Sequence, residues 1–232
     1  MTLIYIFTVL KKFNATERAN IYYLAVPFLS AIIFFTFFLQ IYSSLTLFID
    51  RYFNKTIYSF QIPTTWFSSL EPICIIFMVP ILNYILNFFE RRNFCISDQI
   101  KVALGLIMSA SAFLIFSLLP IAISLDKTLS FIVILIANIL LAFGELWIIP
   151  VTMSLTNTKA PQNYKGTFMG LFYFSLALSG YLSGVVSRYS PKINSPIVDF
   201  SYFFIKIAAI LFIFGLLLMF SKNIYHRFIN VK

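Results

Sequence analysis

The chain has 232 residues, of which 60% are hydrophobic and 11% are charged, and its mean hydropathy is +0.92. A soluble domain carries about 25% charged residues, so this composition excludes a soluble globular domain and predicts a membrane protein. The excess of 17 basic over 8 acidic residues is not a nucleic-acid signal, because Lys and Arg gather in the cytoplasmic loops of membrane proteins. The 29 phenylalanines fit a lipid-facing surface.

The apolar stretch at residues 1–10 is too short to span a bilayer and lacks the cleavage site of a signal peptide, so we expect it to be the end of a helix. A spanning helix needs about 20 apolar residues. Six later segments reach this length, at 20–48, 63–89, 100–125, 129–157, 164–187 and 199–221. The joints at 50–63, 90–101, 126–127 and 157–166 are polar or rich in turn residues. The sequence therefore predicts an all-α integral membrane protein with six transmembrane helices.

The distribution of basic residues predicts the orientation of these helices. The N-terminal segment, the 90–101 and 157–166 loops and the C-terminal tail share one side and hold eleven Lys and Arg, against five in the loops of the other side. Because positive residues favour the cytoplasmic side, both termini are expected in the cytoplasm.

The first two spans carry polar patches. Gln40, with Ser43 and Ser44, lies in the first span, either as part of a site or as a contact between helices. In the second span, "IPTTWFSSLEPICIIFMVP" (62–80) contains Trp66 and Glu71. A polar and aromatic stretch inside a membrane helix suggests a cavity wall, and the alternative for Trp66 is an interfacial aromatic belt.

The fourth span contains Glu145 near its midpoint, in "ILLAFGELWIIPVTMSL" (139–155). A carboxylate at the bilayer centre costs about 2.5–3.5 kcal/mol on insertion scales, so it should face the bundle interior or a water-filled cavity. It is either a ligand- or proton-binding carboxylate or a protonated side chain bonded to a neighbouring helix. Pro150 should kink the same helix and free carbonyl groups, as a hinge, although a proline without a mechanistic role is the alternative.

The last two spans carry weaker signals. In the fifth, two glycine pairs, 166/170 and 180/184, are expected to let helix backbones approach closely. In the sixth, Lys206 is expected to extend its amine to the interface. His226, in the tail, is the single histidine, and Cys74 and Cys95 lack metal or redox spacing, so no enzyme, metal site or cofactor is predicted.

Several stretches resemble the proton-dependent oligopeptide transporter family, a branch of the major facilitator superfamily. "SSLTLFIDR" (43–51) resembles the end of that family's seventh helix, and "IPTTWFSSLEPICII" (62–76) resembles its eighth. "GELWIIP" (144–150), "AP" (160–161) and "GTFMGLF" (166–172) resemble its tenth and eleventh helices and the loop between them. The motifs occur in the family's order and together cover nearly the whole chain.

The resemblance implies the C-terminal half of a major facilitator fold, in which two six-helix halves surround a central site. Residues 13–232 would form this half, and residues 1–12 would be the tail of a linker helix. The resemblance also implies a bacterial inner membrane location, an N-terminal six-helix half as partner, and a proton as coupling ion with no cofactor.

The family's site residues carry over one by one. The tenth-helix glutamate that binds the peptide's amino terminus matches Glu145. The seventh-helix Glu-Gln pair appears as Leu39 and Gln40, so the family's coupling acid is replaced by an apolar residue. The eighth-helix Asn that helps to hold the peptide is Glu71, and the eleventh-helix Trp of the pocket is Phe172.

The sequence thus predicts the C-terminal half of a proton-coupled symporter of di- and tripeptides. Glu145 would hold the peptide's ammonium group, with Glu71, Gln40, Trp66 and Phe172 completing the site. Two alternatives stay open: a truncated remnant without transport activity, or a half-transporter that needs a separate N-terminal half or self-association. The lipid bilayer is a further partner, and nucleic acid is not.

Overall fold

The computed structural model describes residues 14–53, 55–57, 60–92, 96–125, 127–192 and 195–229. The predicted linker-helix tail at 1–12, together with Cys95, lies outside the described residues. Six helices are long and apolar enough to cross a membrane: Thr16–Tyr52, Thr65–Phe89, Asp98–Leu125, Leu129–Lys159, Gln162–Ser187 and Val198–Phe220. Each coincides with one predicted span and begins or ends within about four residues of it. The all-helical membrane class is therefore confirmed.

The elements of the described chain follow in order. They are α2 Ala15–Phe38, η1 Leu39–Ile41, α3 Ser44–Tyr52, β1 Thr56–Ile57, β2 Phe60–Gln61, α4 Thr65–Ser68, α5 Leu70–Arg91, α6 Asp98–Phe116, α7 Leu119–Leu125, α8 Lys127–Lys159, η2 Gln162–Tyr164, α9 Lys165–Ser187 and α10 Val198–Ile229. The two short strands pair antiparallel as a small hairpin at one end of the bundle.

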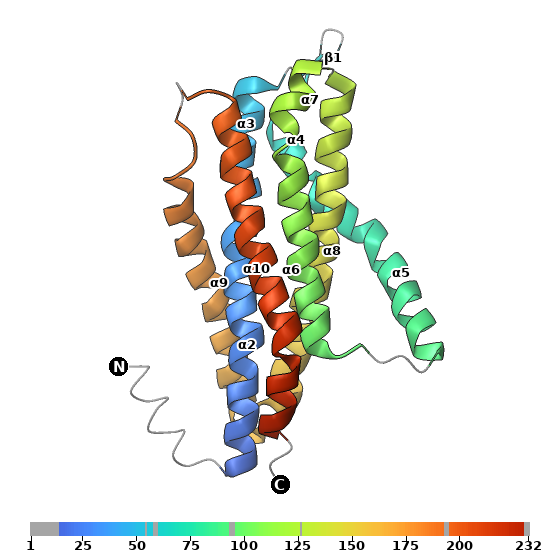
Figure 1. Ribbon diagram of the computed structural model, residues 1–232, viewed down its shortest axis with the longest axis vertical. Helices are drawn as coiled ribbons and strands as arrows, with labels where there is room; N and C mark the ends of the chain where they lie inside the picture. The colour runs from blue at the N-terminus through green and yellow to red at the C-terminus, as the bar shows by residue number, and fades with distance from the viewer. Residues whose placement is uncertain are drawn as a thin grey trace.

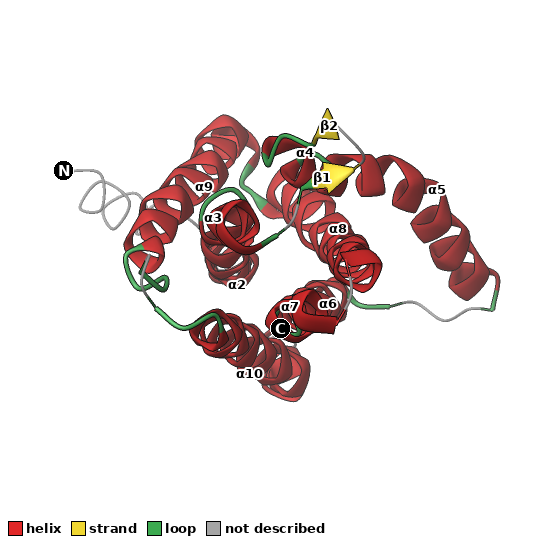
Figure 2. Cartoon of the chain, turned by 90° about the horizontal axis from the view of Figure 1, so that it is seen from above, coloured by secondary structure: helices red, strands yellow, loops and turns green. Residues whose placement is uncertain are grey.

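The long helices form an antiparallel bundle (Figure 1). Helix α6 packs against both α8 and α10, and α2 packs against α9 and α8. Helix α5 packs chiefly against α8 and then diverges from it on the outside of the bundle (Figure 2). The joints before α6 and α9 lie at the end where α2 starts and α10 finishes, and the hairpin, α3 and α7 lie at the other. This arrangement matches the two groups of loops that the sequence predicts.

Two spans are interrupted inside the bundle. The first span changes from α-helix to 3-10 helix at Leu39 and turns at Tyr42 and Ser43 before α3 begins. The third turns at Ser117, shortly before Pro120, whose ring removes a backbone donor. Helix α8, by contrast, continues without interruption through Pro150 to Lys159.

Phenylalanine fills much of the core. Seven of the largest fully buried side chains are Phe34, Phe48, Phe113, Phe116, Phe172, Phe200 and Phe204. The Phe48 ring of α3 lies 4.9 Å from that of Phe200 on α10, and Phe113 of α6 lies 6.3 Å from Phe204. The phenylalanines therefore form the interior as well as the lipid-facing surface that the composition suggested, because interlocking rings supply the dispersion contacts that hold membrane helices together.

The close helix contact lies elsewhere than the sequence predicted. The glycine pairs 166/170 and 180/184 of α9 have nothing within 4 Å of an added Cβ, so their predicted role in close packing is wrong for the described chain. That face of α9 points away from its neighbours, and the buried residues of α9 include Ser175, Ser179 and Ser183. A close approach joins α6 and α8 at Gly105 and Gly144, where a Cβ on either residue would lie 2.8 Å from the other's carbonyl oxygen.

Candidate functional site

Glu145 lies near the middle of α8. It is about 27 Å along the helix from Lys127 and about 21 Å from Lys159, at 1.5 Å per residue. Its neighbour Gly144 contacts α6, and this close approach fixes α8 at the level of the carboxyl group. Glu145 is partly buried, and its Oε2 is buried without a hydrogen-bond partner among the described residues. The carboxyl group is thus held at mid-membrane depth with one acceptor unused.

Glu71 meets Glu145 from the neighbouring helix. It is the second residue of α5 and is only 2% exposed. Its side chain is within hydrogen-bonding contact of the Glu145 carboxyl group, while its Oε1 is buried with no partner in the described part of the chain. The structure therefore brings together the two acids that the sequence identified separately, which lie 74 residues apart in the chain. We call these two side chains the carboxyl pair.

The surroundings of the carboxyl pair hold little opposite charge. No described Lys or Arg forms an ion pair with either acid. Tyr42, from the turn that interrupts the first span, lies near both carboxyl groups. Cys74, buried one turn beyond Glu71, interacts with that residue. Sequence reasoning missed Tyr42, although its place beside Gln40, Ser43 and Ser44 in a polar patch was an available signal.

Trp66 lies in the wall of a hollow near the start of α5. The hollow has a volume of about 520 Å³ and is lined by Ile62, Trp66, Phe67, Ser69, Leu70, Ile73 and Phe131. This volume falls in the range of small-molecule sites, about 300–1,000 Å³. Leu70 and Ile73 flank Glu71 in α5, so the hollow and the carboxyl pair share one stretch of helix. Trp66 itself is 57% exposed.

Gln40 lies in a different part of the bundle. Its Nε2 donates to the carbonyl oxygen of Ser183 at 3.0 Å and to the Ser183 hydroxyl at 2.9 Å. Its Oε1 accepts hydrogen bonds from Ser44 at 2.7 Å and from Ser43 and Ser187 at 3.2 Å each. The amide is fully engaged in joining the first span to α9, which favours the helix-contact alternative for Gln40 over direct contact with a ligand.

Phe172 and Pro150 also lie apart from the carboxyl pair's contact. Phe172 is 1% exposed and packs against Phe28 of α2, with ring centroids 6.2 Å apart. Pro150 is exposed on α8 five residues beyond Glu145, in a helix that remains continuous. The assignments of Phe172 to the site and of Pro150 to a hinge remain predictions.

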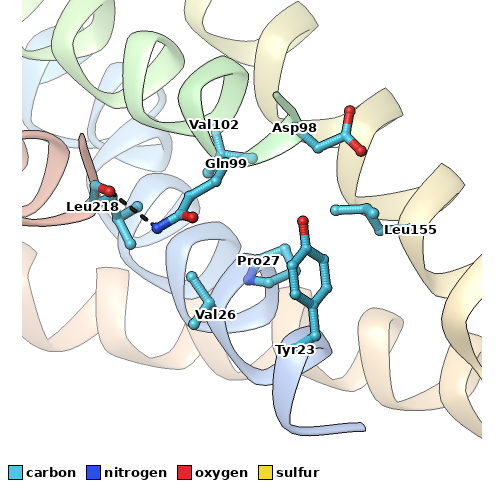
Figure 3. Close-up of a pocket in the computed structure, with 8 residues that line it drawn as sticks. All are labelled: Tyr23, Val26, Pro27, Asp98, Gln99, Val102, Leu155 and Leu218. Carbon is cyan, nitrogen blue, oxygen red and sulfur yellow. Dashed lines mark hydrogen bonds between the residues drawn. The ribbon is translucent and has the colours of Figure 1, made fainter. Parts of the chain in front are cut away.

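A second, smaller cavity lies at the end of the bundle where α2 begins and α10 ends. Its lining comes from α2, α6, α8 and α10, and the side chain of Gln99 donates to the carbonyl oxygen of Leu218 at 3.0 Å across one side of it (Figure 3). The cavity volume is about 10 Å³. That is about the space of one water molecule, so this cavity is too small for an organic ligand. Across the described residues, no group of three or more His, Cys, Asp and Glu side chains is placed to hold a metal ion.

Comparison with known proteins gives a consistent result. The family model described as PTR2, POT family, matches residues 2–203 of the chain. The chain is 25% identical over 185 residues to the peptide transporter YePEPT of Yersinia enterocolitica, and this alignment covers 79% of the chain and 36% of that protein. It is 25% identical over 209 residues to the dipeptide and tripeptide permease A of Escherichia coli, covering 86% of this chain and 40% of the permease.

Solved structures resemble the chain over nearly its whole length. Peptide transporter POT in complex with sulfate matches 97% of this chain with 45% of its own, at a TM-score of 0.80 and 20% identity. A POT family transporter in complex with 5-aminolevulinic acid matches 96% of this chain with 45% of its own, at a TM-score of 0.79 and 16% identity. These likenesses confirm the predicted six-helix membrane fold, which matches part of the fold of the POT transporters. The chain spans less than half the length of these relatives, which are transporters rather than enzymes.

Proposed function

This chain belongs to the POT family, and we propose that it is the C-terminal half of a proton-coupled symporter of di- and tripeptides, in which Glu145 holds the substrate's amino group. The observation that carries the proposal is the contact of Glu145 with Glu71 near the middle of α8. A hollow of about 520 Å³ shares only the start of α5 with this contact, through Leu70 and Ile73. Carboxyl groups at this depth lower the stability of an inserted helix unless a partner compensates them. A substrate cation is such a partner.

The chemistry of an ammonium group fits the free side of Glu145. Its Oε2 is buried and accepts no hydrogen bond from any described residue. A hydrogen bond between a carboxylate and an ammonium group is charge-assisted and roughly twice as strong as a neutral one. In a site of low dielectric the attraction is stronger than in water, so a peptide's amino terminus would be bound and oriented at the same time.

The walls of the site would select the rest of the substrate. Trp66 offers an exposed ring to the hollow beside Glu71, and aromatic side chains give large contact area to apolar groups. Phe172 would shape a pocket from the α9 side, provided that α2 and α9 separate to expose it during the transport cycle. The resemblance of this chain to the family supports the assignments of Trp66 and Phe172.

A second six-helix half would complete the transporter. The relatives are more than twice as long as their match to this chain, and in major facilitator folds the two halves rock about a site between them. In an 18-residue stretch of the second span, which contains α5, only 11% of the residues are buried within this chain, so the span offers a large apolar surface to such a partner or to lipid. We place the assembly in a bacterial inner membrane with both termini of this chain in the cytoplasm, on the excess of basic residues at that end.

Uptake of a labelled dipeptide tests this function. The chain is expressed with the N-terminal half of its relative YePEPT, reconstituted in liposomes, and supplied with dipeptide under an inward proton gradient. Replacing Glu145 by Gln removes a hydrogen bond to a charged group, which contributes about 1.5–3 kcal/mol and corresponds to roughly a 10- to 150-fold loss of affinity.

Glu17→Gln is the matched control, because Gln can still close the capping box at the start of α2. Equal uptake by the Glu145→Gln and Glu17→Gln proteins would refute the role of Glu145. Uptake by this chain alone would favour self-association over a separate N-terminal half, and no uptake by any assembly would favour a remnant without transport activity.

A further inference from the structure

The position of the carboxyl pair sets it apart from the chain's other acids. Among the residues described within the spans, Glu17, Asp50, Asp98 and Asp199 all lie within two residues of the ends of their spans, whereas Glu71 lies six residues inside its span. Glu71 and Glu145 alone in this set meet inside the bundle. A carboxyl group that carries a proton through the interior of this half must therefore belong to the pair.

The contact itself requires a proton. Ionised carboxylates have only acceptor oxygens, so two of them cannot hydrogen-bond to each other until one is protonated. Two like charges at this distance in a poorly solvated site also cannot both persist, which is why adjacent carboxyl groups commonly share one proton. The doubly ionised pair is thus excluded, so the pair holds at least one proton.

The two members of the pair are not equivalent. Glu71 is 2% exposed, and Cys74 beside it on α5 is neutral and buried. Glu145 is only partly buried. From the facing helices, α6 presents Gly105 and Ser109 at this level, and the turn after η1 presents Tyr42, which are all uncharged side chains. The ionic pair of α6, Asp98 with Lys101, lies at that helix's end.

We propose that Glu71 is the proton-binding residue of this half and that it keeps its proton while Glu145 is ionised. The Glu71 hydroxyl donates to the Glu145 carboxylate, and the remaining lone pairs of Glu145 stay available to a cation. This proposal rests on the proposed function only for the identity of that cation, the substrate's ammonium group.

Charge balance connects the proton with the substrate. The pair with one proton has a net charge of −1, and an ammonium group brings the site to zero. Loss of the Glu71 proton would return a buried negative charge to the site, which poor solvation opposes. The proton and the ammonium group are therefore expected to bind to the carboxyl pair at the same time, as symport requires.

Infrared spectroscopy of the chain in lipid bilayers tests the proposal, since the C=O stretch of a protonated carboxyl group is separate from that of a carboxylate. At pH 7 we expect one protonated carboxyl group per chain. Glu71→Gln should abolish this band. The amide NH2 group of Gln can donate a hydrogen bond to the ionised Glu145, so no protonated carboxyl group remains in the pair. Glu145→Gln should keep the band and shift its position, and Glu17→Gln should leave it unchanged.

Absence of the band from the unaltered chain at pH 7, or its survival at full intensity in Glu71→Gln, would overturn the proposal. Circular dichroism confirms that each variant keeps its helical content, and the measurement on the unaltered chain decides the matter even where a variant does not fold. The band needs no peptide, so its absence would leave peptide binding by Glu145 untouched. A failure of dipeptide uptake with the band present would refute the proposed function alone.

Discussion

Replacing Gly144 by Ala should separate α6 from α8 next to the carboxyl pair. A Cβ at this position would lie 2.8 Å from the carbonyl oxygen of Gly105 and would collide with the hydroxyl of Ser109. That hydroxyl donates to the same carbonyl oxygen at 2.8 Å, so it cannot rotate away without giving up its hydrogen bond. The backbone contact is the firmer obstacle, because ordinary contacts of a Cβ lie at 3.4–4 Å and the helices would have to part by about 0.6 Å or more.

Two effects of opposite sign decide the size of the change. Ala is favoured over Gly in a helix interior by roughly 0.5–1 kcal/mol. Overpacking a well-filled contact costs typically about 1–3 kcal/mol. Helix association in a membrane depends on packing rather than on the hydrophobic effect, so we expect the steric effect to dominate. For a chain of this size, each kcal/mol shifts the unfolding temperature by about 2–4 °C.

Gly180→Ala is the matched control, because it makes the same chemical change where no atom lies within 4 Å of the added Cβ. The propensity gain is common to both variants, so their difference isolates the packing effect. We expect Gly144→Ala to unfold at a temperature lower than Gly180→Ala by roughly 2–12 °C, from the overpacking range and the shift per kcal/mol. Thermal unfolding in detergent can be followed by the fluorescence of Trp147, which is 6% exposed and lies one turn beyond Gly144, in a Trp66→Phe background. Equal unfolding temperatures would refute the close approach of α6 and α8.

Three further predictions concern single side chains. Gln40→Leu should lower the free energy of unfolding by about 1–3 kcal/mol, because it leaves buried serine groups without hydrogen-bond partners. The control Gln61→Leu, at an exposed position, should not lower it, and thermal unfolding measures both variants. Phe172→Ala should destabilise the fold by about 3–5 kcal/mol, while Phe174→Ala, which is 65% exposed before the change, should have a much smaller effect in the same assay. Trp66→Ala should weaken the binding of dipeptides with large apolar side chains by up to about 10-fold, because it removes an aromatic contact of about 0.5–1.5 kcal/mol. The binding of dialanine should be less affected. Competition against labelled dialanine measures both, and equal losses for large and small dipeptides would show that Trp66 does not contact the substrate.

The spans could be predicted because the bilayer imposes a length on every apolar helix. The interruption at 39–43 could not, since neither Pro nor Gly marks it. Its carbonyl and hydroxyl groups are instead satisfied locally and by α9, and Gln40 provides the link to Ser183. Pro120 does follow the break at Ser117, but Pro150 and Pro27 lie in helices that continue. Proline alone therefore does not distinguish a broken span from a continuous one.

The site could be predicted one residue at a time but not as a pair. The depth of Glu145 in its span identified it, and the second acid followed from the same reasoning. That Glu71 and Glu145 meet depends on how α5 lies against α8, which no local pattern contains. The glycines illustrate the same limit: spacing pointed to the 180/184 pair of α9, whereas the contact lies at Gly105 and Gly144, one glycine on each of two helices.

The carboxyl pair joins α8, which closely approaches α6, to the least buried of the six described spans. Helix α8 contacts α6 at Gly144, next to Glu145, whereas few residues of the second span are buried and α5 packs chiefly against α8. A change in the attraction or repulsion between the two carboxyl groups is therefore expected to act chiefly on α5, because α8 also packs against α6, α2 and α7. In the protonated pair the Glu71 hydroxyl holds the start of α5 against α8, and with both acids ionised the like charges would push it outward. Because the two helices are packed differently, loss of the proton from Glu71 is expected to move the start of α5. The residues on that turn of α5 also line the Trp66 hollow, so the shape of the hollow would change.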